Sequence, residues 1–240
     1  MKGFFSRYNK AIVALSGGID SSYMLYLAIK YLGSNNLLAV TVCNSHVFAY
    51  EIENARKVAD ILDVAWKPVF AEMTEDFYRN DAKRCYYCKK SILKKLFEIK
   101  KEIGFDVIFD GTNYDDLKEY RPGMKALEEF SVVSPLKENK ITKNDIMTDI
   151  KYTPLSNITF HTESCIATRI IEEHINESTL RIVELVEDEL RTDYPSLRLR
   201  IKEKNIFPEL KSGKRLEDID VRYIFNKYYE IAYPEFFIEK

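Results

Sequence analysis

The sequence predicts an α/β fold in which a parallel sheet carries helices, followed by a smaller α+β region at the C-terminal end. Short apolar segments at residues 11–15, 37–42 and 66–70 alternate with longer segments of helical periodicity, as in parallel strands joined by helices. The first apolar segment runs directly into a turn with two glycines. With 240 residues, of which 46% are hydrophobic, the chain can bury a substantial core.

Each element is placed where apolar periodicity starts and stops. We expect strands at residues 11–15, 37–42, 66–70 and 106–109, and helices at residues 23–32, 48–62 and 91–103. A polar passage that contains Cys85 and Cys88 is expected to precede the third helix. Gly104 should end this helix, because glycine readily adopts the left-handed conformation that follows many helix C-termini.

The C-terminal third of the chain has a different pattern. Periodicity is lost at residues 154–165, which predicts a mobile or site-forming loop, and a charged amphipathic helix is expected at residues 176–191. The alternating residues 197–201 predict a strand with one apolar and one basic face. We therefore place a boundary near Ile170, with a first domain at 1–170 and a region for substrate binding or oligomer contacts at 171–240.

The bulk composition limits the function classes. The formal net charge of −2 and the isoelectric point near 6.0 give no overall positive field, so nucleic acid is not the expected partner. No segment approaches the roughly 20 apolar residues of a membrane span, and residues 1–10 lack a signal-peptide core. Four cysteines are too few for a disulfide framework. We expect a cytoplasmic protein without a membrane partner.

The turn after the first strand carries the strongest chemical signal. In Ser16-Gly17-Gly18-Ile19-Asp20-Ser21, two glycines let the backbone approach a phosphate, and the following helix offers N–H groups to its oxygens. The alternative is an ordinary strand-to-helix turn that an aspartate or serine side chain caps. The order of these residues directly after an apolar strand favours phosphate binding.

A second polar motif follows the strand predicted at residues 106–109. Ligands of open parallel sheets bind beyond the carboxyl ends of the strands, so this motif, Asp110-Gly111-Thr112-Asn113, should face the same crevice as the glycine turn. The glycine turn lacks the lysine that kinases and GTPases place at the terminal phosphates.

The glycine turn resembles the PP-loop of the ATP pyrophosphatase superfamily, which includes NAD and GMP synthetases, argininosuccinate synthetase and tRNA thiolases. The resemblance implies an adenine nucleotide alpha-hydrolase-like (Rossmann-like) domain that cleaves ATP to AMP and pyrophosphate. Asp20 and Asp110 would lie near a bound Mg²⁺ ion. The residues implied in ATP binding are Ser16, Gly17, Gly18, Asp20, Ser21, Asp110, Gly111, Thr112 and Asn113.

Five further motifs narrow the resemblance: RCYYCK at 84–89, DGTNYDDL at 110–117, YRPG at 120–123, SPL at 134–136 and CIATRI at 165–170. Together they resemble the LarE family of ATP-dependent sulfur transferases over residues 11–200. That family supplies sulfur to a pyridinium dicarboxylate mononucleotide during biosynthesis of the nickel-pincer nucleotide. The resemblance implies that Asp20 and Cys165 are catalytic and that the substrate is a small carboxylate or nucleotide. We also expect a homo-oligomer.

Four more residues match family positions that bind substrate: Arg169, Glu187, Arg198 and Arg200. The two strand arginines, Arg198 and Arg200, have an alternative interpretation as part of a solvated basic edge strand.

The cysteines leave three interpretations open. Cys85, Cys88 and Cys165 could hold a [4Fe-4S] cluster with one open iron that carries a sulfide. Cys165 could instead give up its own sulfur, as the resemblance to sacrificial members of the family implies. In the third interpretation, His161 completes a Cys3His zinc site with the same three cysteines. Cys43 is typical of a small buried residue.

Three other functions compete with sulfur transfer to a small molecule. A tRNA thiolase would share the phosphate loop, but it should carry an RNA-binding domain and a basic face. An amide-forming synthetase would use the same adenylate with ammonia and would not need three cysteines. A zinc-stabilised nucleotide-binding protein would hold ATP or AMP without turnover.

Overall fold

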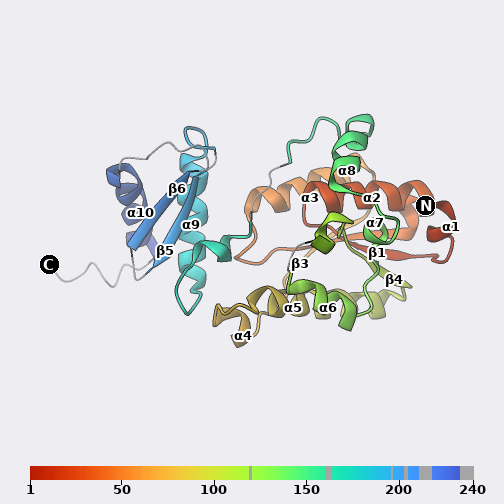
Figure 1. The fold of residues 1–240 in the computed structure, drawn as a ribbon, viewed down its shortest axis with the longest axis horizontal. Coiled ribbons are helices and arrows are strands. Elements are labelled where there is room, and N and C mark those ends of the chain that lie inside the picture. Colours follow the sequence, from red (N-terminus) through yellow and green to blue (C-terminus); the bar gives the residue numbers. More distant parts are fainter. Residues whose placement is uncertain (119–120, 161–163, 196, 203–204, 211–217, 233–240) are drawn as a thin grey trace. The chain divides into compact units, whose positions relative to one another are not determined.

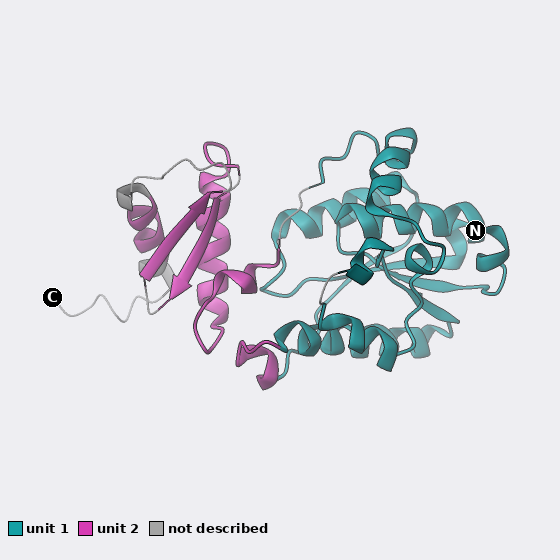
Figure 2. Ribbon diagram, in the orientation of Figure 1, with its two compact units in different colours: residues 1–74, 83–163 teal, residues 75–82, 164–240 magenta. Residues whose placement is uncertain are grey.

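The computed structural model describes residues 1–118, 121–160, 164–195, 197–202, 205–210 and 218–232. It forms two compact units, which Figure 2 colours separately. The first unit contains Met1–Thr74 and Lys83–Glu163, and the second contains Glu75–Ala82 and Ser164–Lys240. The division after Glu163 lies a few residues before the boundary expected near Ile170, and the short segment Glu75–Ala82 groups with the second unit.

The first unit is built on a four-stranded parallel sheet. Its strands are β1 (Ala11–Ala14), β2 (Leu37–Val42), β3 (Trp66–Val69) and β4 (Val107–Phe109), in the spatial order β3-β2-β1-β4. Ala11 is in register with Leu37 on one side and with Val107 on the other. The predicted α/β class and its parallel sheet are confirmed.

Helices cover both faces of this sheet (Figure 1). The longer ones are α2 (Ile19–Leu32) and α3 (Ala49–Ile61) on one face, and α5 (Arg84–Ile103) and α6 (Gly123–Glu129) on the other. The short helices of this unit are α1 (Lys2–Phe5), α7 (Pro135–Glu138) and α8 (Lys143–Asp149). None of the described helices combines the length and the apolar character that a membrane span requires.

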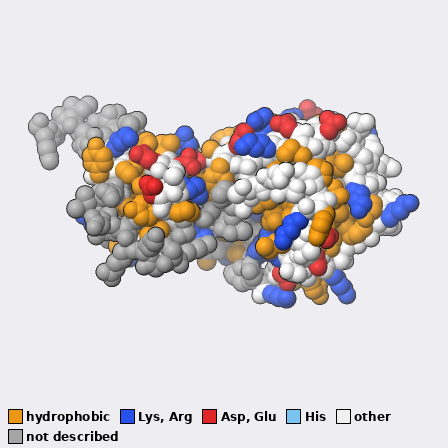
Figure 3. Space-filling model, turned by 90° about the horizontal axis from the view of Figure 1, so that it is seen from above, with side chains coloured by type: hydrophobic (Ala, Val, Ile, Leu, Met, Phe, Trp, Pro, Cys, Tyr) orange, Lys and Arg blue, Asp and Glu red, His pale blue; other side chains and the backbone are white. Residues whose placement is uncertain are grey.

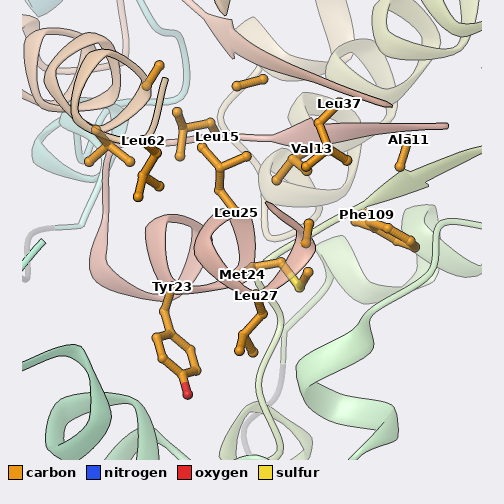
Figure 4. Packing of buried hydrophobic residues seen from close by; sticks show 14 of the residues in the cluster. Ala11, Val13, Leu15, Tyr23, Met24, Leu25, Leu27, Leu37, Leu62 and Phe109 are labelled. Atoms are coloured by element: carbon orange, nitrogen blue, oxygen red, sulfur yellow. The ribbon is translucent and has the colours of Figure 1, made fainter. Parts of the chain in front are cut away.

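The core is divided between these two faces by the alternation of the strands. Ala11 and Val13 of β1 pack with Leu25 of α2, and Figure 4 shows Leu25 extending toward β1. Ile12, which lies between them in sequence, packs instead with Leu96 of α5. The central strands are therefore buried on both sides, as is usual for parallel sheets.

Helix α5 begins at Arg84, seven residues before the predicted start, so the expected polar passage is partly helical. Residues 84–90 carry no aliphatic periodicity, but Tyr86 packs on the core cluster that contains Leu93. This tertiary packing extends the helix where the apolar pattern did not. Gly104 ends the helix in the left-handed conformation (φ 68°), as predicted.

The second unit combines helices with a two-stranded antiparallel sheet. It contains α4 (Glu75–Tyr78), α9 (Glu177–Leu190), β5 (Leu197–Lys202), β6 (Asn205–Leu210) and α10 (Asp218–Ala232). The apolar residues of β5, Leu197, Leu199 and Ile201, are buried, and Arg198 and Arg200 on its other face are half-buried. The alternating pattern predicted for this strand is confirmed, whereas β6 and α10 were not predicted.

Candidate active site

The strand order changes direction at β1, because β2 and β3 lie on one side of it and β4 lies on the other. At such a point the loops that follow the neighbouring strands form a crevice. The loops after β1 and β4 do meet here: a Cβ atom on Gly111 would lie 2.6 Å from the backbone nitrogen of Ser21. Since no real side chain fits this space, glycine at 111 lets the two predicted motifs pack against each other.

The glycine turn after β1 has a shape that only glycine permits. Gly17 has φ +81°, and a Cβ atom on it would lie 2.0 Å from the carbonyl oxygen of Glu51. Gly18 is the N-cap residue of α2, and no side chain caps this helix. The alternative of an ordinary turn capped by an aspartate or serine is therefore not what the structure shows. The helix N-terminus presents backbone N–H groups, which is the arrangement that binds phosphate.

The serine hydroxyls stabilise this turn from within. Ser21 Oγ donates to the Gly18 carbonyl at 3.0 Å and accepts from the Ser16 backbone N–H at 3.1 Å. Ser22 Oγ donates to the same Gly18 carbonyl at 2.8 Å. Both side chains are buried. These bonds fix the conformation of the turn, and direct contact of the Ser16 and Ser21 hydroxyls with phosphate stays a prediction.

Asp20 lies in the first turn of α2 and contacts two residues of other segments. Its Oδ2 atom is 2.5 Å from Lys143 Nζ, and its Oδ1 atom accepts from Asn113 Nδ2 at 3.4 Å. The predicted residues Asp20 and Asn113 are thus together, and a lysine that the sequence did not point to joins them.

Asp110 is a buried carboxylate directly after β4. Ser134 Oγ donates to its Oδ1 atom at 2.7 Å, and Thr112 Oγ1 donates to its Oδ2 atom at 2.6 Å. Lys89 Nζ lies 3.8 Å from Oδ2. Because Lys89 directly follows Cys88, the start of α5 reaches the edge of the sheet where the two motifs meet.

Lys143 is positioned by the start of α8. Its backbone N–H donates to Asp115, and the preceding Thr142 forms a capping box with Asp145. The hydrogen bonds from Thr142 hold the pKa of the Asp145 carboxyl below its usual value. The threonine followed three residues later by aspartate predicts a helix start, and this signal could have directed attention to Lys143 from the sequence.

Cys85 and Cys88 lie three residues apart near the N-terminus of α5, so their side chains share one face of the helix. Neither of the two forms a disulfide, and Cys85 is exposed. Cys88 Sγ lies 3.3 Å from Nε2 of His46, a buried residue that the sequence interpretation missed. His46 could have been found from the sequence, because it lies just beyond the carboxyl end of β2. This is the rule that identified Asp110.

The remaining cysteines are Cys43 and Cys165. Cys43, at the end of β2, has a raised thiol pKa because it is partly buried. Cys165 begins a 3₁₀ turn (Ile166–Arg169) in the second unit, and His161 lies outside the described residues. Within the described part of the chain, no three His, Cys, Asp or Glu side chains form a metal-binding group. The three-cysteine centre and the zinc alternative with His161 stay predictions.

In the second unit, the predicted substrate-binding residues Arg169 and Glu187 bind each other. The Arg169 side chain is wholly buried and forms two parallel bonds to Glu187, Nε to Oε1 at 2.9 Å and Nη2 to Oε2 at 3.0 Å. Arg169 also donates to the Ser164 carbonyl, and Glu187 accepts from the Leu199 backbone N–H. The pair therefore joins the segment around Cys165 to α9 and β5.

Arg200 also ties this segment to β5. It donates to the Thr168 carbonyl at 2.6 Å and to Glu209 Oε2 at 2.9 Å. Arg198 projects from the same face of β5. Arg200 is engaged within the unit rather than lying on a wholly solvated strand edge. Substrate binding by these four residues stays a prediction.

Replacing Glu187 with glutamine is expected to lower the free energy of unfolding of the second unit by about 3–5 kcal/mol, because it leaves the Arg169 charge buried without its counter-ion. Urea unfolding followed by circular dichroism measures this change. The matched control is the double variant Arg169→Met/Glu187→Leu, which removes both charges and should lose much less stability. A single variant as stable as the wild type would contradict the structural role of the pair.

The chain is similar in sequence to known proteins over much of its length. Residues 5–86 match the family model of NAD synthase. An uncharacterized protein of Methanocaldococcus jannaschii is 34% identical over 199 residues, which cover 82% of this chain and 75% of that protein. An uncharacterized protein of Synechocystis sp. is 34% identical over 148 residues, with 61% of this chain and 55% of that protein covered.

A third relative has a described activity. Pyridinium-3,5-bisthiocarboxylic acid mononucleotide synthase of Lactiplantibacillus plantarum is 34% identical over 140 residues, which cover 57% of this chain and 50% of that protein. This chain thus spans three quarters of the first relative and about half of the other two. The NAD synthase match includes β1, the glycine turn and α2. The chain therefore belongs to the PP-loop ATP pyrophosphatase superfamily of ATP-utilising enzymes, within which it resembles the LarE sulfur transferases.

Proposed function

We propose that this chain uses ATP to attach AMP to a carboxylate of a small, nucleotide-type substrate and then replaces a carboxylate oxygen with sulfur. The main support for the proposal is the contact between Lys89 and Asp110. It joins α5, the helix with the two cysteines, to the edge of the sheet where the glycine turn lies. The name of the Lactiplantibacillus plantarum relative, a bisthiocarboxylic acid mononucleotide synthase, supports the same chemistry. The substrate and the sulfur source are both part of the proposal.

In the first step, a carboxylate oxygen of the substrate attacks the α-phosphorus of ATP. The bond between this phosphorus and the oxygen bridging to the β-phosphate breaks, and pyrophosphate leaves. The N–H groups at the start of α2, next to Gly17 and Gly18, suit this leaving group, because they stabilise anionic oxygens without a charged side chain. Lys143 adds a positive charge at the same edge.

Asp20 and Asp110 suit a Mg²⁺ ion, which would neutralise part of the phosphate charge. Both provide oxygen donors, the kind of ligand that Mg²⁺ prefers. Each oxygen of Asp110 accepts one described hydroxyl hydrogen bond and retains further lone-pair capacity. Asn113 and Lys143 hold the Asp20 carboxylate in place at the start of α2.

In the second step, a sulfur nucleophile attacks the acyl carbon of the adenylate and AMP leaves. If Cys165 is the donor, a thioester forms on its sulfur. Loss of the Cα proton and cleavage of the Cβ–Sγ bond then release the thiocarboxylate and leave dehydroalanine. If the three cysteines hold a [4Fe-4S] cluster, that cluster supplies an open iron that can carry a sulfide.

The donors that the first unit contributes fit a cluster or a zinc ion. Cys85 and Cys88 lie on one helix face and form no disulfide, and thiolates are the ligands that iron–sulfur clusters and zinc share. The third thiolate in this proposal is that of Cys165.

Metal analysis after anaerobic purification tests the sulfur source. A cluster predicts about four iron and four sulfide per chain, with a visible absorption band. Cys85→Ala, Cys88→Ala and Cys165→Ala should each lose them, whereas Cys43→Ala, the matched control, should keep them. Stoichiometric zinc without iron would contradict the cluster. A metal-free chain that still forms thiocarboxylate would assign the sulfur to Cys165 itself.

A further inference from the structure

His46 lies in a loop that the structure fixes firmly. This loop follows β2, and the side chain of Asn44 forms two hydrogen bonds with the backbone of Ala71, from Nδ2 to the carbonyl at 2.6 Å and from the N–H to Oδ1 at 3.0 Å. The Val47 N–H donates to the Asn44 carbonyl and closes a turn around His46. The buried Phe48 then occupies the N-cap position of α3. These contacts set the position of the imidazole.

The imidazole of His46 is only 2% exposed, and its Nε2 atom lies 3.3 Å from Cys88 Sγ. Cys85, one helical turn earlier on α5, is exposed. The two cysteines of the motif are therefore not equivalent, because one is open to solvent and the other is held from the interior of the unit. Neither the phosphate loop nor the proposed sulfur chemistry explains this buried contact.

The direction of the hydrogen bond follows from the chemistry of a metal ligand. A cysteine that binds a metal does so as a thiolate, which has no proton to donate. In the loaded protein, the contact can be a hydrogen bond only if Nε2 of His46 carries the proton and donates it to Cys88 Sγ. Such bonds from outside the ligand set orient metal ligands and tune iron–sulfur reduction potentials.

We propose that His46 is a positioning residue of the Cys-x-x-Cys centre: its Nε2–H group donates to the Cys88 sulfur and lowers the electron density on that ligand. The 3.3 Å separation between Nε2 and the Cys88 sulfur is that of a hydrogen bond, which is the role we assign to His46. The inference rests on the proposed metal-binding role of Cys85 and Cys88.

Two substitutions separate the donated hydrogen bond from packing. His46→Leu keeps a buried side chain of moderate size but has no donor, whereas His46→Gln keeps an N–H group near the position of Nε2. His174→Leu, a change at an exposed histidine of the second unit, is the matched control. Each full-length chain is loaded anaerobically with iron and sulfide. Its midpoint potential and the rate at which a chelator removes iron are then measured.

In the loaded His46→Leu chain, the midpoint potential should fall and iron should be lost about ten times faster, the scale typical of a lost partner outside the ligand set. His46→Gln and His174→Leu should stay close to the wild type. Equal potentials and rates in His46→Leu and the wild type would overturn the proposal. So would a His46→Gln chain that changes as much as His46→Leu, because packing alone would then explain the effect.

The experiment gives a different result if the Cys-x-x-Cys motif does not hold a cluster at all. A wild-type chain that takes up neither iron nor sulfide would remove the cluster and this inference together. In contrast, a loaded wild type with an unchanged His46→Leu variant would overturn only the role of His46 and leave the proposed sulfur chemistry intact.

Discussion

Replacing Asp20 with alanine is expected to reduce pyrophosphate release by about 10²–10³-fold, the usual scale for losing one electrostatic group at a reacting centre. The change removes a carboxylate from the start of α2, together with its contacts to Asn113 and Lys143. The measurement is a pyrophosphate assay with MgATP and a pyridinium dicarboxylate mononucleotide. Asp20→Asn, which keeps the size but not the charge, should lose nearly as much activity.

The matched control for this experiment is Asp60→Ala. Asp60 lies on α3 and forms an exposed ion pair with Arg56, so its loss should change pyrophosphate release little. Circular dichroism should show the same fold for all variants. Wild-type pyrophosphate release by Asp20→Ala would contradict the assignment of the ATP site to this edge of the sheet.

Cys165→Ala is expected to abolish thiocarboxylate formation while AMP and pyrophosphate are still produced. In the described structure, the Cys165 backbone carbonyl accepts from Thr168, and this hydrogen bond does not depend on the thiol. The substitution should therefore leave the segment in place and remove only the sulfur. Mass spectrometry of the small-molecule product, together with the pyrophosphate assay, measures the two steps separately.

The same experiment distinguishes the two sulfur sources. With a cluster, Cys85→Ala and Cys88→Ala should also fail to form thiocarboxylate, and the wild type should turn over repeatedly when sulfide is supplied. With sacrificial transfer, only Cys165→Ala fails, and each wild-type chain loses the mass of one H₂S in a single turnover. A Cys165→Ala chain that forms thiocarboxylate at the wild-type yield would contradict both.

Local sequence determined most of the first unit. The strand at residues 37–42 was predicted with its observed bounds, because buried parallel strands are continuous apolar runs that need no distant information. The glycine turn could be predicted for a similar reason, since its backbone shape requires glycine at position 17. Helix α5 was predicted too short, because its first turns are stabilised by packing rather than by apolar periodicity.

The side chains that meet in space were only partly predictable. The parallel-sheet rule correctly brought the loops after β1 and β4 together. We did not apply the rule to the loop after β2, which contains His46. The contacts of His46 with Cys88 and of Lys143 with Asp20 join residues that lie far apart in sequence. A family resemblance pointed to Arg169 and Glu187 as individual residues, but it could not show that they neutralise each other in the interior.

By itself, the sequence determined the fold class, the glycine turn and the helical spacing of Cys85 and Cys88, because each depends on residues close together in the chain. The tertiary structure decided which side chains surround these features: Lys143 beside Asp20, Lys89 beside Asp110 and His46 beside Cys88. The reason is that side chains of different segments meet only once the sheet and its helices have packed.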